Sequence, residues 1–313
     1  MKKNLFSLSV FTLLLTIALV SCQKDKNDDT TTDDTNYDAE ASVQSQDQSN
    51  FSSQIDAVTA DANIILQSSG SYAGRPEEVI AGVCNATYAM DSANNPRTIT
   101  ITYNGANCIG THSRTGTVVI SMPSGTRWKN AGATLTFTYT NLVITRISDN
   151  KSITINGSHT LTNVSGGLFI NFPVVSSLTH KVESDGITVK FDDNTVRTWK
   201  IARQQTYTYN NGIVLTVTGT HTEGSITNVA EWGTNRFGRA FTTAITQPLV
   251  FRQDCSFRLV SGVVTHTVPV FTAVGTFGLN AAGAPTTCPG AGTYYCKLVW
   301  TGPNNTHTVI FPY

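Results

Sequence analysis

Seven carboxylic acids in the second half of the chain are the residues whose type could support hydrolysis. Glycoside hydrolases place two carboxyl groups about 5–10 Å apart, one as the general acid and one as the nucleophile or base. Most of these acids lie in polar segments typical of turns, and no G-x-S-x-G elbow is present, so we predict a protein without catalytic residues. The seven acids are Glu183, Asp185, Asp192, Asp193, Glu223, Glu231 and Asp254.

Metal ligation is the second chemistry to consider, because the chain has six histidines, each standing alone in the sequence. A metal site would need two of them to meet, for example His159 and His221, whereas a polar partner across the strand is the more common use of such residues. The segment Asp192-Asp193-Asn194 could bind calcium, but it lacks the Gly and the distal Glu of a calcium loop, which favours a hairpin turn. We therefore expect no metal and no cofactor.

Five cysteines lie in the body of the chain and can form disulfides in an oxidising compartment, where an odd number leaves one thiol unpaired. We expect one bridge between Cys84 and Cys108. A second bridge is expected from Cys255 to either Cys288 or Cys296. Zinc binding is the less favoured use, because no C-x-x-C pair is present.

Aromatic residues offer the sharpest hint of ligand binding, because flat apolar rings with polar edges suit the faces of sugars. Tyr207 and Tyr209 stand two apart and would share one face of a strand. The ordinary alternative is that such residues belong to the core. The predicted stacking platform consists of Trp128, Trp199, Trp232, Tyr207 and Tyr209.

The N-terminus has the layout of an export signal. Lys2 and Lys3 precede an apolar stretch over residues 5–20, which is too short to span a bilayer of roughly 30 Å. The sequence LVSC that ends at Cys22 resembles the lipobox of bacterial lipoproteins. The resemblance implies that residues 1–21 are a signal peptide and that Cys22 is acylated. Membrane lipid is then a partner, since each buried methylene contributes roughly 0.8 kcal/mol.

Residues 22–40 are rich in Asp, Thr, Asn and Gln, which predicts a disordered tether. Its first part, Gln23 to Asp29, resembles the acidic export signal of surface lipoproteins of the Bacteroidota. That resemblance implies lipid anchoring in the outer membrane with exposure at the cell surface.

Charge is distributed unevenly along the chain. Residues 1–50 hold eight acids and four lysines, so 17 of the 21 basic and 13 of the 21 acidic side chains lie in residues 51–313. This excess is small and scattered. A nucleic-acid partner is therefore excluded, because it would require clustered Lys and Arg.

The residues that follow the tether predict one helix and then many strands. A 3–4 residue spacing of apolar side chains indicates an amphipathic helix over residues 41–70, placed to cap one face or end of a sheet. The helix positions are Val43, Phe51, Ile55, Val58, Ala62 and Ile65.

From Arg97 the apolar period changes to two, as where Ile99, Ile101 and Tyr103 alternate with threonines. This alternation is typical of strands with one wet face. Turns are expected at Asn104-Gly105, Asp185-Gly186 and Asn211-Gly212. The fold class predicted is mainly β, either an antiparallel β-sandwich or an extended curved sheet over residues 71–313, with one N-terminal helix.

Several segments after residue 75 resemble uncharacterised Thr-rich surface lipoproteins of the Bacteroidota, a family with no activity to transfer. These segments are residues 97–101, 107–110, 114–120, 157–163, 255–257 and 261–264. We therefore expect a non-enzymatic binding or structural role at the cell envelope, with a glycan or a protein as ligand. The alternatives are a glycan-active hydrolase that uses an Asp/Glu pair, and a lipid-handling protein with an apolar, concave face open to solvent.

Overall fold

The computed structural model describes residues 35–68, 83–172, 174–288, 290, 292–302 and 305–313. The predicted signal peptide, Cys22 and the tether as far as residue 34 lie outside these ranges. Within the described ranges, no helix has both the length and the apolar character that crossing a membrane requires.

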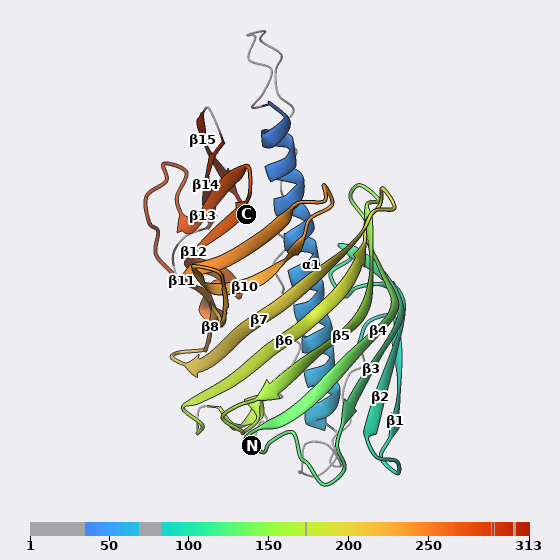
Figure 1. Ribbon diagram of the computed structural model, residues 1–313. Coiled ribbons are helices and arrows are strands. Elements are labelled where there is room, and N and C mark those ends of the chain that lie inside the picture. Colours follow the sequence, from blue (N-terminus) through green and yellow to red (C-terminus); the bar gives the residue numbers. More distant parts are fainter. Residues whose placement is uncertain (1–34, 69–82, 173, 289, 291, 303–304) are drawn as a thin grey trace.

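The described residues form one long helix, α1 (Thr35–Ser68), and one antiparallel sheet of 15 strands that curls around it (Figure 1). The mainly β prediction with one N-terminal helix is confirmed. The strands are β1 (Ala86–Asp91), β2 (Arg97–Ala106), β3 (His112–Met122), β4 (Ala133–Arg146), β5 (Ser152–Asn163), β6 (Ser177–Lys190), β7 (Val196–Tyr209), β8 (Ile213–Gly219), β9 (His221–Glu223), β10 (Ile226–Thr234), β11 (Ala240–Arg252), β12 (Arg258–Val268), β13 (Phe271–Leu279), β14 (Tyr295–Thr301) and β15 (Thr306–Pro312). Two short 3₁₀ turns, η2 (Phe169–Asn171) and η3 (Gln253–Cys255), lie between strands.

Strand order follows the chain from β1 to β7 and again from β10 to β15, with a fork between these two runs. The end of β7 pairs with β8, beginning at Arg203 opposite Gly219, whereas the middle of β7 pairs with β10, where Ile201 lies opposite Glu231. Strand β11 divides in the same way, with Leu249–Arg252 on β8 and its first half on β10. The fork therefore brings Arg203 and Glu231 close together.

The alternating pattern places apolar side chains on the inner face of the sheet. In β2, Ile99, Ile101 and Tyr103 are buried, while the threonines between them are half-buried or exposed. Branched and aromatic residues suit such a pleated, half-wet surface, which explains the strand-forming tendency of these Thr-rich segments.

The turn predictions are confirmed only in part. Asn211-Gly212 forms the β7–β8 hairpin, where Asn211 has a φ of 56°. Asn104-Gly105 lies inside β2. The chain turns instead at Asn107, whose side chain accepts a hydrogen bond from the backbone N–H of Thr111. Asp185-Gly186 also lies inside a strand, at a register shift between Ser184 and Ile187. Asn-Gly and Asp-Gly pairs favour bulges as well as turns, because both need permissive backbone positions.

Helix α1 begins six residues before the predicted helix, so Thr35–Glu40 are helical rather than part of a disordered tether. The reason is tertiary contact: Glu40 is buried, accepts a hydrogen bond from Asn235 and pairs with Arg239 at 3.0 Å. The predicted two-sided character is also wrong, because polar residues such as Gln44 and Asp61 are as buried as Phe51. A sheet that curls around a helix buries more than one of its faces.

Both predicted disulfide arrangements are confirmed. Cys84 and Cys108 are bridged with a Cα–Cα separation of 5.2 Å, and Cys255 is bridged to Cys288 rather than to Cys296, at 6.0 Å. Cys296 is a free, buried thiol on β14, and burial raises its pKa to about 12. Closing loops of 24 and 33 residues stabilises the fold by roughly 3.5 kcal/mol each in the chain-entropy description.

Candidate functional site

A pocket of about 250 Å³ lies between α1 and the forked part of the sheet, and it is partly open to solvent. One wall is apolar and is built by β8, β10 to β13 and the turn before β12. Val217, Ala230 and Ile245 form an apolar cluster there that is separate from the main core. The apolar lining consists of Leu215, Val217, Ala230, Ile245, Leu249, Phe251, Phe257, Leu259, Val264 and Phe277.

The opposite wall is α1, which presents small or polar side chains to the pocket. Ser45, Ser52 and Ala60 are among them. Small residues opposite an apolar wall leave the space between the two unfilled, whereas protein interiors are otherwise packed to crystal-like density. The pocket therefore results from the side-chain sizes on one stretch of the helix.

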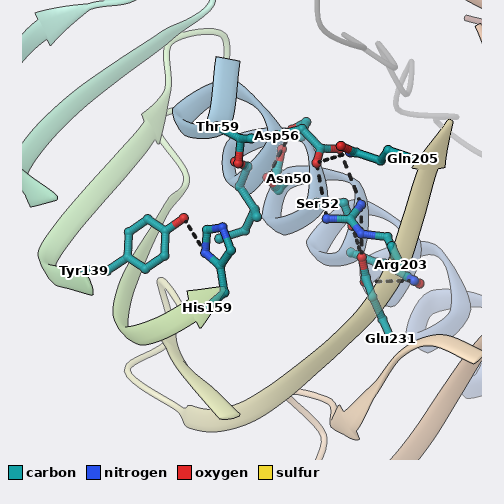
Figure 2. A network of polar contacts seen from close by, with 12 residues as sticks. Asn50, Ser52, Asp56, Thr59, Tyr139, His159, Arg203, Gln205 and Glu231 are labelled. Atoms are coloured by element: carbon teal, nitrogen blue, oxygen red, sulfur yellow. Dashed lines mark hydrogen bonds and ion pairs between the residues drawn. The ribbon is translucent and has the colours of Figure 1, made fainter. Parts of the chain in front are cut away.

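A network of polar contacts, drawn in Figure 2, lines one side of the pocket. The Arg203 guanidinium donates to both carboxylate oxygens of Asp56, with Nη2 lying 3.3 Å from Oδ1, and Nη1 lies 3.8 Å from Glu231 Oε1. Glu231 also accepts hydrogen bonds from the Ser52 hydroxyl and, at 3.2 Å, from Gln48 Nε2. The network thus joins one face of α1 to β7 and β10 through one positive and two negative groups.

Two further side chains of β7 extend the network. Gln205 Nε2 donates to Asp56 Oδ1 at 3.4 Å, and the Tyr207 hydroxyl donates to Gln205 Oε1 at 3.1 Å. Tyr207 and Gln205 both line the pocket. Each group at the polar side is therefore held by a neighbour, which fixes its position before any ligand arrives.

Burial dominates the electrostatics of the two acids. Desolvation raises the pKa of Asp56 and of Glu231 above ordinary values, and the charge of Arg203 opposes that rise at both. The two differ in access to solvent, because the Asp56 side chain is 25 % exposed and that of Glu231 only 3 %. Asp56 is the carboxylate that a bound molecule can reach.

Other ion pairs fasten the rest of α1 to the sheet. Asp61 contacts Arg114 at 2.9 Å and accepts a hydrogen bond from the Tyr103 hydroxyl, with both charged groups buried. Nearer the N-terminal end, Asp47 pairs with Arg236 at 2.6 Å. These contacts lie away from the pocket and set the position of the helix.

Sequence reasoning missed Asp56, Arg203 and Gln205. Arg203 and Gln205 are buried and stand in phase with the buried Trp199 and Tyr207 of β7, whereas Gln204 and Thr206 between them are half-buried. A charged residue in phase with the core positions of a strand is the signal that was available, since buried charges require partners.

The predicted aromatic platform does not face solvent as a unit. Trp128 and Trp199 are 1 % and 0 % exposed, so neither can present a ring face to a sugar. Trp199 instead packs edge-on against Phe51 of α1, with ring centroids 4.7 Å apart. Trp199 is turned inward by the alternation of β7, and Trp128 is buried in the connection between β3 and β4.

The other three aromatic residues lie in different surroundings. Tyr207 is buried at the pocket, whereas Tyr209 is exposed. The ring of Trp232 stacks on His221 at a centroid distance of 3.9 Å, which covers one of its faces.

The remaining candidates do not meet in one place. Of the seven acids considered for hydrolysis, Glu231 alone lines the large pocket. His159 is buried beside Phe137 and within 3.0 Å of the Tyr139 hydroxyl, whereas His221 lies on β9 with Glu223. Strands β6, β7 and β10 separate β5 from β9, so these two histidines do not share a site.

In comparisons with protein-family models, with curated proteins and with solved structures, nothing matches this chain. The resemblance to Thr-rich lipoproteins of the Bacteroidota therefore remains an expectation from the sequence.

Proposed function

We propose that this chain is a lipid-anchored protein of the bacterial outer membrane, displayed at the cell surface, that binds a small amphipathic molecule without catalysis. The lipobox-like sequence at Cys22 and the acidic residues after it support the anchor and the location. The pocket between α1 and the forked sheet supports the binding role, and it is the observation that carries the proposal.

The composition of the pocket fits a ligand with an apolar body and one polar end. Ligand pockets are typically lined by apolar side chains with a few placed polar groups. Here Leu215, Leu249 and Phe251 belong to the apolar wall, and Asp56 and Gln205 stand at the polar side. The volume of about 250 Å³ is close to the lower end for small-molecule sites, so the ligand is small or enters in part.

The two other functions considered have less support. A glycan platform loses its largest rings, because Trp128 and Trp199 are buried. A hydrolase would use Asp56 and Glu231, the two acids that line the pocket. Arg203 contacts both carboxylates, and Ser52 and Gln48 also donate to Glu231, so neither acid is free to protonate a leaving group.

Binding of an apolar dye tests the proposal. N-Phenyl-1-naphthylamine would be titrated into the Cys22→Ala chain, which has no acyl group to compete, and a rise in fluorescence on saturable binding is expected. Ala60→Leu fills the pocket and should weaken binding at least tenfold, because Ala60 lines it. Ala57→Leu is the control, since Ala57 is half-buried on the same helix outside the pocket. Absence of saturable binding to the parent chain would refute the proposal.

Location requires a separate measurement. Protease treatment of intact cells should remove the parent protein, and the Cys22→Ala variant should fractionate away from membranes. Protection of the parent protein on intact cells would refute surface display while leaving the binding role open to the dye titration.

A further inference from the structure

The charges that line the pocket are unequal. Asp56, Glu231 and Arg203 are the charged residues of the described lining, which gives two acids and one base. Arg203 contacts both acids and its side chain is 7 % exposed. Its positive charge is therefore already paired with carboxylates of the protein. The polar side therefore offers a ligand more acceptor than donor character.

We infer that the pocket takes an amphiphile with a positively charged amino group at one end and an apolar chain at the other. This inference rests on the proposed binding function and names the class of ligand. The amino group would contact the Asp56 carboxylate, and the chain would lie against the apolar wall around Leu215 and Ile245.

The chemistry of an ammonium group suits this position. It carries three donors and no acceptor, and the accessible groups beside Asp56 include the half-buried Ser52 and Gln48, whose oxygens can accept. Coulomb attraction is stronger at a partly buried carboxylate than in bulk water. A cation bound there would favour the ionised form of Asp56 and so oppose the rise in its pKa that burial causes.

A negatively charged head group is disfavoured by the same arrangement. It would enter a site with two carboxylates, and like charges in one site oppose ionisation of both. The buried base cannot compensate, because Arg203 would have to leave Asp56 or Glu231 without a charged partner. Fatty-acid anions are therefore the ligands that the charge pattern rejects.

Three probes with an apolar tail of similar length and different head groups test the inference: octylamine, 1-octanol and octanoate. Each would be titrated at pH 7 into the Cys22→Ala chain by displacement of N-phenyl-1-naphthylamine. Octylamine is expected to bind at least tenfold more tightly than octanoate, with 1-octanol between them. Octanoate binding as tightly as octylamine overturns the inference but not the binding function. Failure of all three probes and of the dye overturns both.

Two variants test whether the Asp56 carboxylate causes the preference for octylamine over 1-octanol. Asp56→Asn should reduce octylamine affinity to that of 1-octanol, whereas Asp185→Asn, at an exposed position of β6 outside the pocket, should leave the preference unchanged. Retention of the full preference in Asp56→Asn would overturn the role of Asp56. Circular dichroism checks the fold of each variant, and the ranking of probes on the parent chain tests the inference even if Asp56→Asn does not fold.

Discussion

One helix contacts the sheet in two different ways. Toward the main core, α1 presents Phe51, Ile55 and Val58, each with no exposed surface. Toward the fork of the sheet it presents Ser52 and Ala60, and a pocket remains. The comparison shows that the curled sheet does not by itself create the cavity: side-chain size along α1 decides which part is packed and which part is open to a ligand.

The largest expected difference between the two regions concerns their ion pairs. Asp61→Asn leaves Arg114 buried without a charged partner, which should lower the free energy of unfolding by about 3–5 kcal/mol. Asp56→Asn should cost only about 1–2 kcal/mol, because Arg203 keeps Glu231 and Asp56 is partly exposed. Urea denaturation measures both values, and equal losses would contradict the contrast between a sealed region and an open one.

Acid should weaken the packed region through His159. Burial lowers the pKa of this imidazole from 6.5 to about 3. Between pH 6.5 and 3 the unfolded chain therefore binds a proton that the folded chain does not, so stability falls as the pH falls through that window.

Comparison of urea denaturation at pH 7.5 and pH 4.5 checks this effect. Between these two pH values, the free energy of unfolding of the His159→Gln variant should fall by about 2–3 kcal/mol less than that of the parent chain. An unchanged slope in His159→Gln would argue against a neutral, buried imidazole.

The smallest expected effect is the difference in stability between leucine substitutions at two alanines of α1, one in the main core and one at the pocket. Ala62 has no exposed surface and belongs to the main core, so Ala62→Leu should overpack it and cost about 1–3 kcal/mol. Ala60 lines the pocket, so the added atoms of Ala60→Leu enter free space and should change stability by less than about 1 kcal/mol. Thermal or urea unfolding compares the pair, and an equal cost at both positions would show that the pocket collapses in solution.

The strands were predictable because their pattern is local. Ile99, Ile101 and Tyr103 alternate with threonines, and a period of two needs no knowledge of the rest of the chain. Bulges were not predictable, since Asp185-Gly186 has the composition of a turn and its place inside β6 depends on pairing with β5 and β7.

The pocket was beyond sequence reasoning for the same physical reason. Leu215 and Ile245 have the pattern of ordinary core positions, and they line a cavity only because Ser52 and Ala60 stand opposite them. Asp56 and Arg203 are 147 residues apart in the chain, so nothing local indicates that they meet.

The early start of α1 has a mechanical consequence. If Cys22 is acylated as proposed, only residues 22–34 separate the membrane anchor from the first turn of a helix that the sheet surrounds. That segment can extend at most about 45 Å. Drag on the exposed domain would then pull along the central helix rather than on an edge strand. Among the described side chains, the pair of Glu40 and Arg239 lies nearest to the point where that load enters.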